Sequence, residues 1–270
     1  MRATVGVFDS GVGGLSVVEA LHRLAPGLEI RYLADTAYFP YGERTAAEIE
    51  ERAVAMVGRL IAEGANIIVV ACNTATSAAL ERLREEFSPP VPIVGMEPPV
   101  KPAIEHSRTR RVLVLATAGT VSGVRLARLT ETHRGDAEVF KVPMPGLADL
   151  VEAGEIDGPH VEGVLHAAID ELVASGVDQV ALGCTHYGFL RPLLRRMLPA
   201  EVELVDAAEP VARHTMNVIA RANLDVDASA PEREVLCYAT GDAAAFEATV
   251  ERLRAAGAAL PPTRVSRPVA

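Results

Sequence analysis

Short apolar runs alternate with helix-like stretches along this chain, and each run ends in small or polar residues. This alternation is typical of an α/β fold, in which helices connect the strands of a parallel sheet. Two amphipathic stretches, residues 15–24 and 75–86, predict helices. The four strongest apolar runs predict buried strands at residues 5–8, 67–71, 112–115 and 177–182.

Residues that can bind or react follow each of these predicted strands. The strand ends read DSG at 9–11, CNT at 72–74, ATAGT at 116–120 and GCTH at 183–186. Ligands of open parallel sheets bind outside the carboxyl ends of the strands. We therefore expect these four segments to form a binding site.

The four strand ends form two similar pairs, because the length of chain from Ser10 to Thr117 nearly equals that from Cys72 to Cys184. This spacing predicts two similar α/β lobes related by a pseudo-twofold axis, each with a mostly parallel sheet flanked by helices. The active site is then expected in the cleft between the two lobes.

Two proline-containing segments predict where the chain crosses between the lobes. They are GMEPP at 95–99 and DAAEP at 206–210, and proline ends the element that precedes it. We predict a first lobe of residues 1–97 and 208–270 and a second lobe of residues 98–207. Residues 261–270 show no periodicity and are expected to form a loose tail.

Composition and charge narrow the range of functions. The 270 residues are 49% hydrophobic and 23% charged, which excludes a disordered chain. Acidic residues outnumber basic ones 36 to 26, so a primary nucleic-acid role is not expected. The three widely spaced cysteines favour a reducing compartment, and no apolar run approaches the roughly 20 residues of a membrane span. We expect a cytoplasmic protein without a signal peptide, a membrane segment or a long N-terminal regulatory extension.

A glycine-rich turn, SGVGG at 10–14, follows the first predicted strand and precedes a helix. Its backbone N–H groups can approach an anion at the helix N-terminus. The spacing departs from the G-x-G-x-x-G fingerprint, because Ser16 stands where a third glycine is needed, so a dinucleotide cofactor is not expected. The alternative is a plain strand-to-helix turn that Asp9 or Ser10 caps.

A second turn, DTAYFPYGERT at 35–45, is either a binding loop or an ordinary surface turn. It combines Asp35 with the rigid segment Pro40-Tyr41-Gly42, which would hold an aromatic hydroxyl and backbone amides in place. Binding groups concentrate on loops of this kind when a rigid scaffold supports them.

Cys72 and Cys184 each follow a buried strand and precede a helix or a turn. At such a position the helix dipole lowers the pKa of a thiol and favours the reactive thiolate. A single buried cysteine is more often a small apolar residue, but two cysteines in matching positions favour chemistry. Cys237 has no such turn and is expected in the core.

Metal binding and a Cys–His nucleophile are the alternatives for these cysteines. The seven histidines form no H-x-H or H-E-x-x-H pair, so no metal site is expected. His186 would act as the base for a nucleophilic Cys184 or Cys72, but this leaves the second thiol without a role. Two thiols across a cleft instead favour proton transfer on opposite faces of one carbon, which inverts its configuration.

Four segments, in this order along the chain, resemble the glutamate racemase family. They are GVFDSGVGGLSV at 6–17, DTAYFPYGERT at 35–45, ACNTATSAAL at 71–80 and LGCTHYGFL at 182–190. A weaker likeness, including ATGD at 239–242, covers nearly the whole chain. The resemblance implies two α/β lobes, a homodimer, and interconversion of L- and D-glutamate without a cofactor, which supplies D-glutamate for peptidoglycan.

The resemblance also implies roles for individual residues. Cys72 and Cys184 would be the catalytic acid/base pair, with Asp9 assisting on the Cys72 side. His186 would assist on the Cys184 side, with support from Glu152. The residues that would hold the carboxylates and the ammonium group of the substrate are Ser10, Tyr41, Gly42, Asn73, Thr74, Thr117, Thr120 and Thr185.

Some positions depart from the family pattern. Gly188-Phe189 replaces the usual proline and leucine after CTHY, and Met144-Pro145 stands where a Cys-Pro pair is usual. Gly123 and Leu126 replace a serine and a tyrosine. These positions flank the predicted catalytic residues, so the changes bear on activation and dimer contacts more than on the chemistry.

Other functions stay open at this point. An aspartate racemase, or a one-cysteine decarboxylase or isomerase, would belong to the same superfamily, although the two cysteines and His186 favour glutamate. A non-catalytic amino-acid-binding protein would need the anion-binding strand ends but not both thiols.

Overall fold

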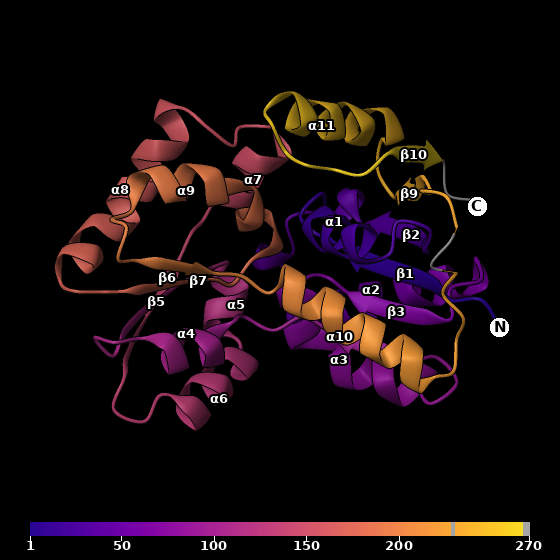
Figure 1. Ribbon diagram of the computed structural model, residues 1–270, viewed down its shortest axis with the longest axis horizontal. Coiled ribbons are helices and arrows are strands. Elements are labelled where there is room, and N and C mark those ends of the chain that lie inside the picture. The colour runs from indigo at the N-terminus through magenta and orange to yellow at the C-terminus, as the bar shows by residue number, and fades with distance from the viewer. Residues whose placement is uncertain (228–229, 267–270) are drawn as a thin grey trace.

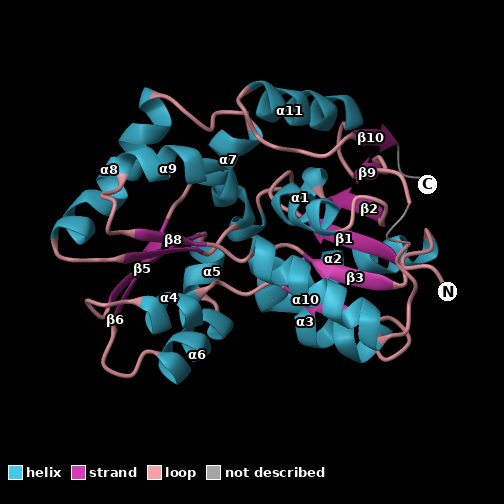
Figure 2. Ribbon diagram, viewed as in Figure 1, coloured by secondary structure: helices cyan, strands magenta, loops and turns pink. Residues whose placement is uncertain are grey.

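The computed structural model describes residues 1–227 and 230–266. In these residues the strands form two sheets, one of six strands and one of four, and neighbouring strands within them pair in parallel. Figure 1 shows the two sheets side by side, with helices on both faces of each, and Figure 2 gives the same view by secondary structure. The predicted α/β fold is therefore confirmed. Over the described ranges, no helix combines the length and the hydropathy that a membrane span requires.

The six-stranded sheet has the order β10-β9-β2-β1-β3-β4. Its strands are β1 (Thr4–Asp9), β2 (Glu29–Ala34), β3 (Ile67–Val70), β4 (Ile93–Gly95), β9 (Val235–Ala239) and β10 (Thr263–Ser266). The helices around it are α1 (Leu15–Leu24), α2 (Ala46–Ala62), α3 (Asn73–Phe87), α10 (Ala208–Arg221) and α11 (Ala243–Ala255), with the 3-10 turns η1 (Thr36–Tyr38) and η2 (Tyr41–Glu43).

Both faces of this sheet are buried. On β3, Val69 lies in a core with residues of α1, α10 and α11, whereas Ile68 and Val70 lie in a second core with residues of α2 and α3. Strands covered on both faces need apolar residues at every position, because successive side chains point to opposite faces. This explains the uninterrupted apolar runs in the sequence.

The four-stranded sheet has the order β6-β5-β7-β8. Its strands are β5 (Arg111–Ala116), β6 (Glu138–Pro143), β7 (Gln179–Leu182) and β8 (Glu203–Val205). The helices around it are α4 (Val100–His106), α5 (Ala118–Ser122), α6 (Val124–His133), α7 (Leu147–Glu152), α8 (Pro159–Ala174) and α9 (Arg191–Met197), with the 3-10 helix η3 (Thr185–Leu190).

The chain leaves the six-stranded sheet after β4 and returns to it with α10 and β9. The lobe boundaries at 97/98 and 207/208 stay a prediction. One core cluster contains residues from both sheets, including Val7 of β1 and Leu115 of β5, so the two sheets are joined by apolar packing as well as by the chain crossings.

The two sheets repeat one pairing at their carboxyl ends. In the first sheet β1 pairs with β3, and in the second β5 pairs with β7. The segments that begin at Ser10 and Cys72 therefore leave neighbouring strands, and so do the segments that begin at Thr117 and Gly183.

The expectation of a loose tail is wrong for residues 263–266. They form β10 and pair with β9, and Val265 lies opposite Cys237. A four-residue edge strand is too short to show a periodic pattern, and the backbone of its neighbour holds it in place. Residues 267–270, which the same expectation covers, lie outside the described residues.

Candidate active site

A cavity of about 70 Å³ lies at the carboxyl ends of both sheets. Its lining comes from the segments that follow β1, β2 and β3 and from those that follow β5, β6 and β7. The predicted site residues in this lining are Ser10, Tyr41, Gly42, Cys72, Asn73, Thr74, Thr117, Cys184, Thr185 and His186. Asp9, Glu152 and Thr120 lie behind the lining and bond to it.

A larger cavity, of about 640 Å³, also reaches Cys184. It is lined by residues of α1 and η3, among them Glu19 and Phe189, and Cys72 is not part of its lining. The smaller cavity brings both cysteines together, one from each sheet, and is therefore the candidate active site.

Cys72 is the N-cap of α3, and the helix begins at Asn73. Its sulfur accepts a hydrogen bond from Ala75 N at 3.4 Å, and its thiol donates to Ser10 Oγ at 3.9 Å. Burial and the negative charge of Asp9 raise the pKa of Cys72, and the bond from Ala75 N opposes them only in part. The expectation that the helix N-terminus lowers this pKa is wrong, because desolvation outweighs the helix end. The raised pKa favours the neutral thiol of Cys72.

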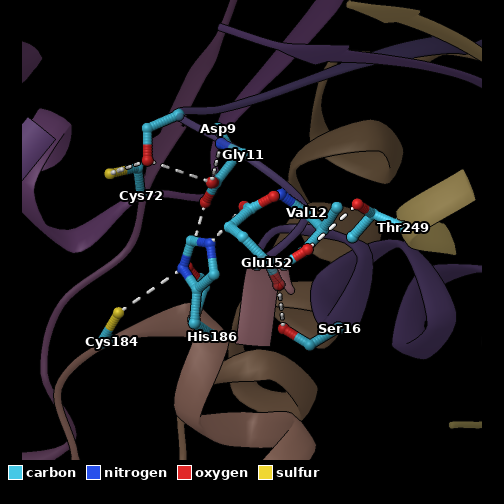
Figure 3. A network of polar contacts seen from close by, with 12 residues as sticks. Asp9, Gly11, Val12, Ser16, Cys72, Glu152, Cys184, His186 and Thr249 are labelled. Atoms are coloured by element: carbon cyan, nitrogen blue, oxygen red, sulfur yellow. Dashed lines mark hydrogen bonds and ion pairs between the residues drawn. The ribbon is translucent and has the colours of Figure 1, made fainter. Parts of the chain in front are cut away.

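Cys184 is joined to a buried imidazole–carboxylate pair. Its sulfur lies 3.7 Å from Nδ1 of His186, and Nε2 of the same ring lies 2.8 Å from Oε1 of Glu152 (Figure 3). Burial alone would lower the pKa of His186, but the hydrogen bonds to Cys184 and Glu152 outweigh burial and raise it well above its usual value. The protonated form of the His186 imidazole is therefore favoured, with the Cys184 sulfur on one side of the ring and the Glu152 carboxyl group on the other.

Asp9 contacts the segments that carry both cysteines. Its carboxylate accepts from Thr185 Oγ1 at 3.0 Å and from Gly11 N at 2.8 Å, and Ser10 Oγ lies at 3.4 Å. Burial raises the pKa of Asp9 to about 6, although the nearby charge of His186 opposes the rise. Asp9 thus links Ser10, the partner of Cys72, to Thr185, the neighbour of Cys184.

The glycine-rich turn binds an anion that belongs to the protein. Val12 N donates to Oε1 of Glu152 at 2.6 Å. A Cβ atom on Gly11 would overlap this carboxylate, and one on Gly13 would overlap the ring of His186, so both positions need glycine. The helix after the turn begins at Leu15 without a side-chain cap, so neither Asp9 nor Ser10 caps it.

Threonine hydroxyls bridge the two sides of the cavity. The Oγ1 atoms of Thr74, Thr117 and Thr120 lie 3.0–3.2 Å from one another, with Thr74 on α3 and the other two at the start of α5. Beside them, the buried carboxamide of Asn73 has no hydrogen-bond partner among the described residues. Because buried polar groups are normally paired, this amide is available to a ligand in the cavity.

A buried carboxylate holds the loop that carries Tyr41. Asp35 is fully buried and accepts from Tyr41 Oη at 2.6 Å, from Thr240 Oγ1 at 2.7 Å and from Arg52 through two N–H groups at 2.6 and 3.0 Å. The Arg52 guanidinium also stacks over the ring of Tyr38 at 3.8 Å. Burial and the Asp35 charge raise the pKa of Tyr41, so its hydroxyl stays neutral. The 35–45 turn is therefore a braced loop rather than an ordinary surface turn.

Replacing Arg52 with methionine is expected to lower the free energy of unfolding by about 3 kcal/mol, because Asp35 then stays buried without its charged partner. Urea unfolding monitored by circular dichroism measures this change. Arg82→Met is the matched control, since Arg82 forms an exposed ion pair with Glu86 and its loss is expected to cost less than about 0.5 kcal/mol. Equal losses in the two variants would mean that Asp35 does not need Arg52.

Several residues of the cavity lining are absent from the sequence-based site. They are Phe39, Glu43, Ala118, Met144, Pro145, Gly146, Ala148 and Asp149. The Phe39 ring lies 5.6 Å from that of His186, and the position of Phe39 beside Pro40 was the available signal. Asp149 precedes Glu152 by three residues, so helical spacing would have placed it on the same face of α7.

Cys237 lies fully buried in the core on β9, as expected. All three cysteines are free thiols. No group of three or more His, Cys, Asp or Glu side chains that could hold a metal ion occurs within residues 1–227 and 230–266.

Residues 5–215 match the family described as Asp/Glu/Hydantoin racemase. The chain is 42% identical to a glutamate racemase of Ectopseudomonas mendocina, over 93% of this chain and 95% of that protein. It is 46% identical to a glutamate racemase of Pseudomonas aeruginosa, over 82% of this chain and 84% of that protein.

Solved structures with the same fold include a glutamate racemase from Escherichia coli in complex with L-glutamate and the activator UDP-MurNAc-Ala, which has a TM-score of 0.84, is 30% identical and covers 100% of this chain and 99% of its own. Another is a glutamate racemase from Thermus thermophilus in complex with β-chloro-D-alanine, with a TM-score of 0.80, 35% identity and coverage of 98% and 97%. An aspartate racemase from Picrophilus torridus is 16% identical with a TM-score of 0.55, which is a likeness of fold alone.

Proposed function

Because the chain belongs to the Asp/Glu/hydantoin racemase family, and within it to the glutamate racemases, we propose that it interconverts L- and D-glutamate by proton transfer at the α-carbon. The observation that carries this proposal is the cavity into which each sheet contributes one cysteine. Binding needs no base and exchange on one face needs a single base, whereas direct inversion by proton transfer uses one group on each face of the carbon.

The reaction needs one cysteine as thiolate and the other as thiol. The Cys184 thiolate, stabilised by the His186 imidazolium, takes the α-hydrogen as a proton, and the electron pair left on the carbon delocalises into the α-carboxylate. The Cys72 thiol then delivers its proton to the opposite face. The turnover ends with Cys184 as thiol and Cys72 as thiolate, which is the state that processes the other enantiomer.

Groups around the cavity suit a substrate with two carboxylates and one ammonium group. The unpaired amide of Asn73 and the hydroxyls of Thr74 and Thr117 can donate to a carboxylate, and Thr120 supports both hydroxyls from behind the lining. Donors held in advance by the protein are well suited to the negative charge that develops on the α-carboxylate during proton removal. Ser10, Tyr41, Gly42 and Thr185 complete the proposed substrate contacts.

The pair of thiols supplies both proton transfers, so the proposed reaction needs no cofactor. Free cysteines support a reducing compartment such as the cytoplasm. A homodimer and the supply of D-glutamate for peptidoglycan follow from the family resemblance and are part of the same proposal.

Proton NMR in deuterated buffer tests the proposed function, with L-glutamate and L-aspartate as separate substrates and no added pyridoxal phosphate. We expect deuterium to enter the α-carbon of glutamate while circular dichroism of the substrate decays to zero. The same result with aspartate alone would keep the mechanism and reject the substrate. No exchange with either amino acid, from folded protein with reduced thiols, would favour a binding role.

A further inference from the structure

Glu152 is the last residue of α7, and two carbonyl groups at this helix end have no hydrogen-bond donor within the turn. The chain turns after the helix at Gly154, whose φ of 83° lies in the left-handed region. The N–H groups of residues 153–155 bond back to the carbonyls of residues 149–151. The carbonyls of Glu152 and Ala153 receive none of these bonds and need partners from elsewhere.

Two side chains of α11 supply those partners. Thr249 Oγ1 donates to the carbonyl of Glu152 at 3.0 Å, as Figure 3 shows, and Arg252 Nε donates to the carbonyl of Ala153 at 3.0 Å. Arg252 Nη2 also donates to Thr249 Oγ1 at 2.7 Å, which orients the threonine hydroxyl toward Glu152. Helix α11 precedes β10 of the six-stranded sheet, whereas α7 follows β6 of the four-stranded sheet, so the contact joins the two halves of the molecule.

The same face of α11 also supports the group that binds the Glu152 carboxylate. Phe246, one helical turn earlier, stacks on Tyr32 with ring centroids 6.2 Å apart. The Tyr32 hydroxyl donates to the carbonyl of Gly11, and the N–H of the same peptide group, Val12 N, donates to Glu152 Oε1 at 2.6 Å. Helix α11 therefore supports both the main chain and the carboxylate of Glu152.

We propose that Thr249 and Arg252 are positioning residues for Glu152: they hold its carboxyl group 2.8 Å from Nε2 of His186, the ring whose Nδ1 lies 3.7 Å from the Cys184 sulfur. The catalytic consequence of this positioning rests on the proposed function, because only a reaction that uses Cys184 as a base depends on the contact between His186 and Cys184. Partners behind a catalytic histidine set its orientation and basicity, and small misplacements at such a site lower the rate steeply.

Thr249→Val tests this proposal, because it removes the hydroxyl and nearly preserves the shape of the side chain. Thr249→Ser keeps the hydroxyl and is the conservative variant. Thr215→Val is the matched control, since Thr215 is a buried threonine whose hydroxyl donates to Val211 O within α10 at 2.8 Å. Each variant is made in the intact chain and in a chain that also carries Cys72→Ala and Cys237→Ala. Of the three cysteines, this second chain keeps Cys184 alone.

The first readout is the ultraviolet absorbance of the Cys184 thiolate as a function of pH. In Thr249→Val we expect the midpoint of thiolate formation to rise by about half a pH unit or more, because a looser Glu152 stabilises the imidazolium less. Thr249→Ser and Thr215→Val are expected to keep the midpoint of the parent. An unchanged midpoint in Thr249→Val would overturn the positioning role.

The second readout is kcat/KM for glutamate in the intact chain, which is expected to fall about tenfold in Thr249→Val and to stay within about twofold in the other two variants. If Thr249→Val does not fold, Arg252→Met replaces it, because Arg252 is an exposed side chain. Arg252→Met is expected to raise the midpoint of thiolate formation by a smaller amount. No shift in this variant would overturn the proposal. The thiolate titration needs no substrate. A shifted midpoint in a protein that does not racemise glutamate would therefore reject the proposed function and keep the positioning role.

Discussion

Replacing either Cys72 or Cys184 with alanine is expected to lower kcat for glutamate racemisation by about 10³-fold or more, because each cysteine serves one face of the α-carbon and alanine transfers no proton. Both cysteines line one cavity, and each follows a strand of a different sheet. The rate of loss of substrate circular dichroism measures the effect.

The two alanine variants are also expected to differ in a way that identifies the face each cysteine serves. Without Cys72, the Cys184 thiolate can still remove the α-hydrogen of one enantiomer and return deuterium from solvent to the same face. Cys72→Ala therefore exchanges one enantiomer with retention of configuration, and Cys184→Ala is expected to exchange only the other. Proton NMR of each pure enantiomer in deuterated buffer reads this out.

Cys237→Ala is the matched control for both variants. Cys237 is fully buried on β9, so the change is expected to cost about 1 kcal/mol of stability and to leave kcat within about twofold of the parent. Racemisation that survives within tenfold in Cys72→Ala or Cys184→Ala would contradict the two-base mechanism.

His186→Asn is expected to lower kcat/KM by about 100-fold, because it removes the imidazolium that stabilises the Cys184 thiolate. In the structure this ring bridges Cys184 and Glu152 at 3.7 and 2.8 Å. Without this ring, the thiolate that the reaction needs has no imidazolium beside it. The racemisation rate as a function of pH is the first measurement, and the acidic limb of the profile is expected to move to higher pH.

Comparing the two directions of racemisation gives a second test of the role of His186. Two enantiomers have equal free energies, so kcat/KM must be the same in both directions in every variant. The expected asymmetry lies in the α-deuterium isotope effect, which rises only for the enantiomer whose hydrogen Cys184 removes. His166→Asn is the matched control, because His166 pairs with Asp170 at 3.0 Å on the exposed face of α8. Equal isotope effects for both enantiomers in His186→Asn would contradict the assignment of this ring to Cys184.

Tertiary packing reverses the expected shift in the pKa of Cys72, and it supplies the anion that the glycine-rich turn binds. A cysteine at a helix N-terminus is expected to have a lowered pKa, but the pKa of Cys72 is raised because the sulfur is buried beside Asp9. The glycine-rich turn was expected to bind an anion, and it does so with Glu152, a residue far along the chain. Neither burial nor the approach of a distant carboxylate can be read from local spacing.

The sequence by itself determined the α/β class, the strands that carry the site and most of the cavity lining, because these depend on local periodicity and on the residue types at strand ends. Tertiary structure alone decided which groups of the two sheets contact one another. It placed Glu152 against Val12, and it brought Thr249 to the end of α7. These contacts join segments that follow strands of different sheets, so they form only when the two sheets pack together. No pattern within one segment encodes them.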